Sequence, residues 1–144
     1  MSNNLDEFVE GLQKQIYDET RAEYGDVGFE RWMNPKYMGV IENPSGYGRI
    51  TGPCGDTMTI YLSLENDRVK EAKFQTDGCG ASMMCGSFAS ELSLGKKPDE
   101  VFDITDETIL EILGDLPEEH KHCALLAANT LKAAIEDYRT RRKE

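Results

Sequence analysis

Three cysteines of this chain stand where a turn or a helix start would expose a thiol. Cys54 and Cys79 lie in Gly-Pro-Cys-Gly and Asp-Gly-Cys-Gly, and Cys123 follows a histidine. Thiolate sulfur selects zinc, copper and iron–sulfur centres. The three lie far apart in the sequence, unlike the close Cys-x-x-Cys pairs of a zinc ribbon. The pattern therefore predicts a metal or iron–sulfur site assembled by folding and argues against a local zinc finger.

Two more side chains near these cysteines could complete the ligand set. Asp56 follows Cys54 closely and adds a carboxylate, and His122 adds an imidazole directly before Cys123. Thiols and imidazole with one carboxylate suit iron or zinc rather than magnesium or calcium, because sulfur and nitrogen select the softer metals. The carboxylate would hold iron less firmly than another thiolate, so a cluster bound here should be easy to build and to lose.

Cys85 and His120 are the remaining residues of these types. Cys85 is interpreted mainly as a small buried helix residue, with a reserve ligand or resolving thiol as the alternative. His120 has no adjacent cysteine and is expected to be exposed. In a reducing cytosol the four cysteines are expected to be free thiols rather than two disulfides.

The hydrophobic pattern of the first third of the chain indicates a helix followed by a long loop. Apolar residues recur at helical spacing over 5–23, which predicts an amphipathic helix ending near Gly25. Residues 34–53 are dense in Gly, Pro and Asn, so this segment is predicted to be a loop with a short strand at 47–51.

Alternating apolar and polar residues then predict two strands, at 57–64 and 72–76. A polar turn between them indicates an antiparallel hairpin. Cys54 would precede this hairpin and Cys79 would follow it. Both thiols should therefore reach the same end of the sheet.

The second half of the chain is predicted to be helical. Helices are expected over 81–94 and 106–113, each ended by a glycine, and a long final helix begins near Pro117. Cys123 would lie in the first turns of this last helix. Unpaired N–H groups and the helix dipole should lower the pKa of its thiol there and favour thiolate.

Length and charge limit the candidate functions. The 144 residues fit a single core, with 1–33 as an N-terminal helical extension and 34–144 as the main domain. A net charge of -11 would repel phosphate backbones and anionic membrane surfaces, so nucleic acid and lipid are poor partners. No apolar stretch approaches the roughly 20 residues of a membrane span, and no leader pattern is visible, so the protein is expected in the cytoplasm.

Taken together, these motifs resemble the IscU/NifU N-terminal type of iron–sulfur cluster assembly scaffold. The resemblance implies an α+β fold in which a small antiparallel sheet of about three strands packs with helices, including a long C-terminal helix. It also implies a protein that is not an enzyme: it assembles a 2Fe-2S cluster from ferrous iron and sulfur supplied by a cysteine desulfurase, and hands the cluster to apo-proteins. The segments that carry the likeness are Asn34-Pro35, Cys54-Gly-Asp56, Gly78-Cys79-Gly80, Leu116-Pro117, His122-Cys123 and the final helix to about Tyr138.

Carried over to this chain, the resemblance makes Cys54, Cys79 and Cys123 the cluster ligands. It makes Asp56 and His122 the other ligands or iron-entry groups, and Cys123 the favoured acceptor of persulfide sulfur. An alternative is a zinc-binding sulfur acceptor that stimulates a desulfurase, although the insertion typical of such relatives is absent. A structural zinc domain is a third reading, which leaves the labile Asp56 unexplained.

One segment departs from the family pattern. Many members carry Leu-Pro-Pro-Val-Lys before the last cysteine, where a DnaK-type chaperone binds, but this chain has Leu-Pro-Glu-Glu-His over 116–120. Weak or no chaperone recognition is therefore expected. The sequence leaves open whether the isolated protein carries zinc or a cluster, whether a homodimer bridges the cluster, and which proteins receive it.

Overall fold

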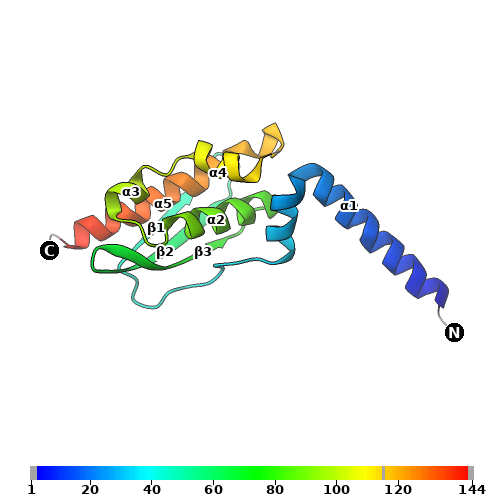
Figure 1. The fold of residues 1–144 in the computed structure, drawn as a ribbon, viewed down its shortest axis with the longest axis horizontal. Helices are drawn as coiled ribbons and strands as arrows, with labels where there is room; N and C mark the ends of the chain where they lie inside the picture. The colour runs from blue at the N-terminus through cyan, green and yellow to red at the C-terminus, as the bar shows by residue number, and fades with distance from the viewer. Residues whose placement is uncertain (1–2, 115, 143–144) are drawn as a thin grey trace.

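A small sheet covered by helices makes up the body of the molecule, and one long helix projects from it (Figure 1). The computed structural model describes residues 3–114 and 116–142. The elements run in the order α1 (Asn3–Met33), β1 (Gly46–Thr51), β2 (Thr57–Glu65), β3 (Arg68–Thr76), α2 (Gly80–Ser93), α3 (Pro98–Phe102), α4 (Asp106–Leu113), the 3-10 turn η1 (Glu118–His120) and α5 (Lys121–Arg142).

The three strands form an antiparallel sheet in the order β1-β2-β3. Ile60 of β2 pairs with Gly48 on one side and with Phe74 on the other. The tight β2–β3 turn places Asn66 and Asp67 at positive φ, which short polar side chains tolerate. This architecture confirms the predicted α+β class with a small antiparallel sheet, an N-terminal helix and a long C-terminal helix.

One face of the sheet carries the core, because α2 and α5 both pack against it. α5 approaches β1 so closely that a Cβ atom on Gly48 would lie 2.6 Å from the Thr130 carbonyl oxygen and from the Ala134 nitrogen. Glycine at this position allows α5 to pack closely against β1. The largest fully buried apolar side chains are those of Phe74, Met58, Ile60, Leu62, Met84, Ile109, Leu131 and Ile135.

α1 is bent at Gly25, whose φ of 81° and ψ of 172° are not helical. The predicted end of the first helix near Gly25 is therefore confirmed, but the second helical segment, which continues from there to Met33, was not predicted. The outer segment extends away from the body and leaves its apolar stripe exposed (Figure 1). This stripe consists of Leu5, Phe8, Val9, Leu12 and Ile16.

The inner segment of α1 is attached to α2 by Arg31. This buried guanidinium donates a 2.8 Å hydrogen bond to the Ser87 hydroxyl and a 3.1 Å charged one to Glu91, and it stacks over Phe88. Packing against α2 explains why the helix resumes after Gly25. The limits of the units 1–33 and 34–144 stay predictions.

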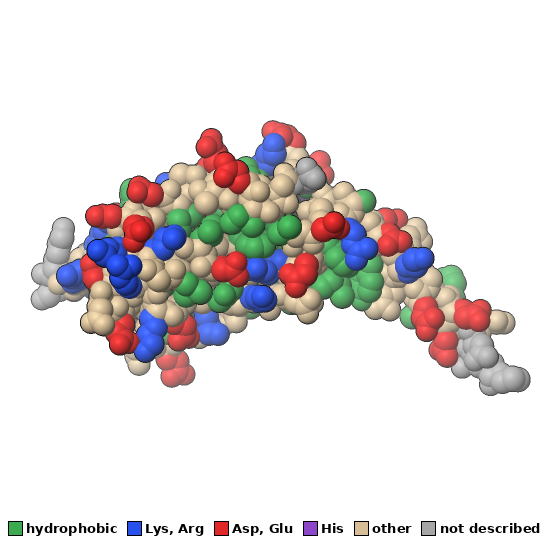
Figure 2. All heavy atoms as spheres, viewed as in Figure 1, with side chains coloured by type: hydrophobic (Ala, Val, Ile, Leu, Met, Phe, Trp, Pro, Cys, Tyr) green, Lys and Arg blue, Asp and Glu red, His purple; other side chains and the backbone are tan. Residues whose placement is uncertain are grey.

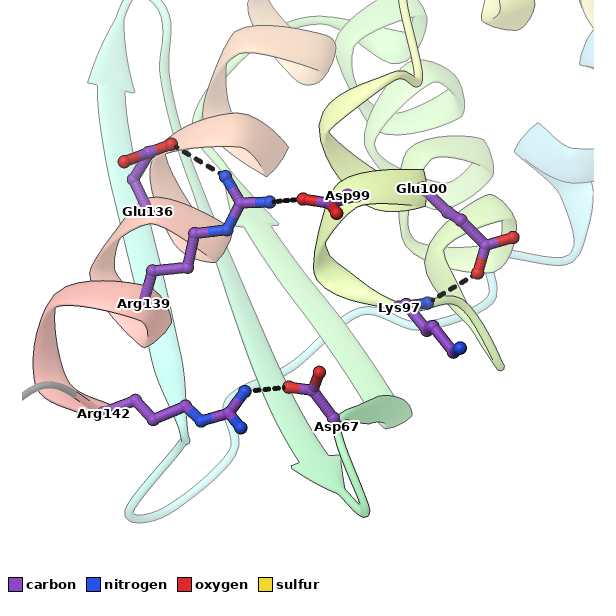
Figure 3. Close-up of polar contacts among 7 residues, drawn as sticks. All are labelled: Asp67, Lys97, Asp99, Glu100, Glu136, Arg139 and Arg142. Carbon is purple, nitrogen blue, oxygen red and sulfur yellow. Dashed lines mark hydrogen bonds and ion pairs between the residues drawn. The ribbon is translucent and has the colours of Figure 1, made fainter.

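Ion pairs hold the far end of α5 to the body (Figure 3). Arg139 pairs with Asp99 of α3 and with Glu136, and Arg142 pairs with Asp67 of the β2–β3 turn. The short helix α3 was not predicted from the sequence. Acidic side chains spread over the face drawn in Figure 2, while basic ones gather most densely near this end of α5. Within 3–114 and 116–142, none of the helices has both the length and the apolar character that a bilayer span needs.

Candidate metal centre

The starts of two helices and the turn before β2 meet at the end of the body where α1 joins it. Cys79 is the residue that precedes the first turn of α2, and Cys123 lies in the first turn of α5. Asp56 ends the turn between β1 and β2, a turn closed by a 2.8 Å hydrogen bond from the Gly52 amide to the Asp56 carbonyl oxygen. The hairpin was predicted to bring Cys54 and Cys79 to one end of the sheet, and the structure places Asp56, two residues after Cys54, beside Ser82 together with Cys79.

A buried serine links the residues of this site. The Oγ atom of Ser82 lies 3.4 Å from Asp56 Oδ2, 3.4 Å from Cys123 Sγ and 4.0 Å from Cys79 Sγ. Its side chain is fully buried, and its single hydrogen can go to only one acceptor at a time. Ser82 was not predicted from the sequence, although its place one helical turn after Cys79 is a usable signal.

Gly78 leaves the space in which this arrangement fits. A Cβ atom on Gly78 would lie 2.5 Å from Ser82 Oγ and 2.8 Å from Asp56 Oδ2. Any other residue would displace the hydroxyl or the carboxylate. The glycine before Cys79 in the Asp-Gly-Cys-Gly motif therefore leaves room for the side chains of the site and also allows the turn.

The structure brings His120 into the site. One ligand atom each of Cys79, His120 and Cys123 lies within 4.8 Å of the others. The expectation that His120 is exposed was wrong, since its side chain is only 21% exposed and its Nε2 atom lies 3.3 Å from Glu23 Oε1 on α1. The ring of Tyr24 also packs against it, at a centroid distance of 5.6 Å. Burial, and then the charge of Glu23, raise the pKa of Tyr24 to about 12.

His122 and Cys54 lie at the margin of this group. The Nε2 atom of His122 is 3.7 Å from Cys123 Sγ. Cys54 is exposed on the turn before Asp56, beside Gly55 at a φ of 87°. Among the described residues, the sets of three ligand atoms within 4.8 Å of one another do not include either residue.

Burial dominates the electrostatics of Cys123. It raises the pKa of the thiol to about 11, although the Ser82 hydroxyl acts in the opposite direction. The expected lowering of the pKa by the helix start was wrong, because Cys123 is fully buried and the desolvation of its thiolate outweighs the helix start. A metal ion bound at this thiol would favour its thiolate form.

Cys85 is fully buried within α2, in agreement with the main interpretation of it as a small core residue. Burial raises the pKa of its thiol, and the neighbouring Cys123 and Cys79 add to this effect. A neutral thiol packed in the core behaves as a small apolar side chain. Its alternative role as a reserve ligand stays a prediction.

The assembled groups offer sulfur from Cys79 and Cys123, imidazole from His120 and a carboxylate from Asp56. Zinc and iron both accept such a mixed set, whereas magnesium and calcium prefer oxygen alone. The family model described as the NifU-like N terminal domain matches residues 23–144. The chain belongs to this family.

Several named relatives agree with that assignment. The chain is 42% identical over 116 residues to the protein named iron-sulfur cluster assembly scaffold protein IscU 1 of Archaeoglobus fulgidus. The aligned part covers 80% of this chain and 76% of the relative. It is 37% identical over 119 residues to the protein named iron-sulfur cluster assembly scaffold protein IscU of Aquifex aeolicus, covering 81% and 76%.

Solved structures show the same fold. A NifU-like protein (N-terminal) from Brucella abortus superposes with a TM-score of 0.70 at 14% identity, covering 85% of this chain and 98% of that one. A putative SUF-system scaffold protein from Fervidobacterium islandicum gives 0.65 at 20% identity, covering 80% and 98%. At these identities the likeness supports the fold alone.

Proposed function

We propose that this chain is an iron–sulfur cluster assembly scaffold of the IscU/NifU kind. It receives ferrous iron and desulfurase-derived sulfur, assembles a 2Fe-2S cluster and passes it to apo-proteins. The observation that carries the proposal is the convergence of Cys79, Cys123 and Asp56 on the hydroxyl of Ser82. The scaffold names of the relatives at 37–42% identity support it.

In this proposal each residue has a distinct task. Cys79 and Cys123 hold iron as thiolates, and their protons leave to solvent when the metal binds. Cys54 joins them from its exposed turn, where Gly55 gives the backbone freedom to move. Asp56 and His122 complete the iron coordination as exchangeable ligands.

Sulfur enters as the terminal atom of a desulfurase persulfide. The Cys123 thiolate attacks that atom, a new S–S bond forms on Cys123, and the desulfurase thiolate leaves. Conversion of this sulfur to sulfide then takes two electrons from an external reductant. Because Cys123 is buried, the start of α5 has to move before the desulfurase can reach it.

A zinc-binding sulfur acceptor that stimulates a desulfurase is the second candidate. The set of Cys79, His120 and Cys123 favours it, because two thiolates and an imidazole are ordinary zinc ligands. In that case zinc would stay bound while sulfur is passed on. A cysteine desulfurase is the partner in both candidate functions.

Anaerobic incubation with ferrous iron, cysteine and a cysteine desulfurase tests the proposal. We expect visible charge-transfer bands of a 2Fe-2S cluster, lost in Cys79→Ser or Cys123→Ser and largely retained in Cys85→Ala. Cys85 is the matched control because it is buried in the same helix, α2, next to the site. Zinc in every preparation, with no such bands, would favour the second candidate.

A further inference from the structure

A second group of metal-binding side chains lies directly beside the thiol site. Glu23 comes from α1, two residues before the bend at Gly25, and Glu119 and His120 come from η1. One ligand atom of each lies within 4.8 Å of the others. The Nε2 atom of His120 is 3.3 Å from Glu23 Oε1 and 4.0 Å from Glu119 Oε1.

His120 belongs to both groups, because its imidazole also lies within ligand distance of Cys79 and Cys123. The two groups differ in chemistry. Two carboxylates and an imidazole bind a divalent ion through oxygen and nitrogen, whereas the thiol group binds it mainly through sulfur. The shared imidazole makes this arrangement more than an acidic patch, since an ion at the carboxylates would be held by the same side chain that lies beside Cys79 and Cys123.

We propose that Glu23, Glu119 and His120 form a second, weaker site for a divalent metal ion, which loads Fe²⁺ into the thiol site through His120. The ion keeps its oxidation state throughout. As it moves, Cys79 and Cys123 replace the two carboxylates and release their protons to solvent. The direction of this transfer rests on the proposed function, but the existence of the second site does not.

The exposure of the residues fits such a route inwards. The Glu119 side chain is 76% exposed, that of Glu23 44% and that of His120 21%, whereas Cys123 is fully buried. An ion from solvent can therefore meet the carboxylates and the exposed Cys79 before it reaches the buried Cys123. Glu23 ties this route to α1, so the end of the outer segment, just before the bend at Gly25, takes part in the site.

An equilibrium experiment tests the second site. In a Cys79→Ser/Cys123→Ser protein, anaerobic dialysis against Fe²⁺ should still show a bound ion, and adding Glu23→Gln should weaken its binding by about tenfold. Glu111→Gln is the control, because Glu111 is an exposed carboxylate on α4 outside both groups. Absence of bound Fe²⁺, or equal loss with Glu111→Gln, would overturn the site.

A kinetic experiment uses the unmodified thiols and does not depend on the double variant folding. Co²⁺ mixed with the protein should develop a sulfur-to-metal charge-transfer band as it reaches Cys79 and Cys123. We expect Glu23→Gln to slow this band several-fold and to leave its final intensity unchanged, with Glu111→Gln at the parent rate. Equal rates for all three proteins would overturn the transfer step. Because neither experiment uses desulfurase or forms a cluster, this proposal can fail while the scaffold function stands.

Discussion

The Oγ atom of Ser82 lies 3.4 Å from the Sγ atom of Cys123, so a hydroxyl from the first turn of α2 meets a thiol from the first turn of α5. The same hydroxyl lies 3.4 Å from the carboxylate of Asp56. A buried polar atom placed among three potential ligands fixes their relative positions and cannot be removed without leaving acceptors unpaired.

Ser82→Ala should therefore weaken metal binding more than it weakens the fold. We expect the affinity for Co²⁺ or Zn²⁺ to fall by about tenfold, in the range seen when outer partners of metal ligands are removed. Loss of one neutral hydrogen bond should cost about 1 kcal/mol of unfolding free energy. Ser93→Ala is the control, because Ser93 is also buried in α2 but bonds only to the Ser90 carbonyl oxygen. Equal metal affinity in the two variants would contradict the role of Ser82.

The strands, and the arrival of the residues that flank the hairpin at one end of the sheet, could be predicted because they depend on local pattern. Period-two alternation fixes which side chains of β2 face the core, and a short turn fixes the antiparallel pairing with β3. A hairpin then carries the residues that flank it to one end of the sheet. Local pattern also predicted that Cys123 lies near the start of the last helix, because an apolar stripe marks that helix and Pro117 marks its beginning.

The parts that could not be predicted depend on contacts between distant segments. His120 contacts Glu23 and Tyr24, which lie at the end of the predicted first helix, but no sequence pattern indicated that this helix end packs against η1. Cys123 has a raised pKa because its burial outweighs the favourable helix start, and burial is a property of the packed core. Family resemblance supplied the candidate ligands, but it gave no signal for Ser82.

Alkylation rates should separate the four cysteines into two classes. Cys54 and Cys79 are exposed, whereas Cys85 and Cys123 are buried and have raised thiol pKa values. Because only the thiolate reacts, iodoacetamide at pH 8 should modify the first pair at least tenfold faster in the metal-free protein. Peptide mass spectrometry at timed intervals measures this, with the urea-unfolded protein as the control in which all four rates converge. Fast modification of Cys123 in the folded protein would show that the start of α5 opens readily.

Gly48→Ala should destabilise the fold through a clash between β1 and α5. The added methyl group would lie 2.6 Å from backbone atoms of Thr130 and Ala134, which cannot move without shifting the helix. We expect a loss of about 2 kcal/mol or more in urea unfolding. Gly11→Ala is the matched control, since its Cβ would meet nothing within 4 Å and alanine favours a helix over glycine. A Gly48→Ala protein as stable as the Gly11→Ala protein would show that α5 can settle elsewhere on the sheet.

Asp56→Ala should lengthen the life of an assembled cluster and slow its transfer to an apo-ferredoxin. A carboxylate is a hard, exchangeable donor on iron otherwise held by thiolates, so it offers the position at which an incoming ligand can attack. Its removal also frees the Ser82 hydroxyl to donate to Cys123 alone, because the hydrogen is no longer shared with Asp56 Oδ2. Both effects hold the cluster more tightly.

Decay and transfer rates, followed by visible absorbance for the parent and the Asp56→Ala protein side by side, test this expectation. Asp103→Ala is the control, because Asp103 is an exposed carboxylate just after α3 and makes the same change in net charge. We expect Asp103→Ala to follow the parent and Asp56→Ala to be several-fold slower in both measurements. Faster cluster loss in Asp56→Ala would make this carboxylate a required anchor, and release of the cluster would then have to begin at a thiolate or at an imidazole.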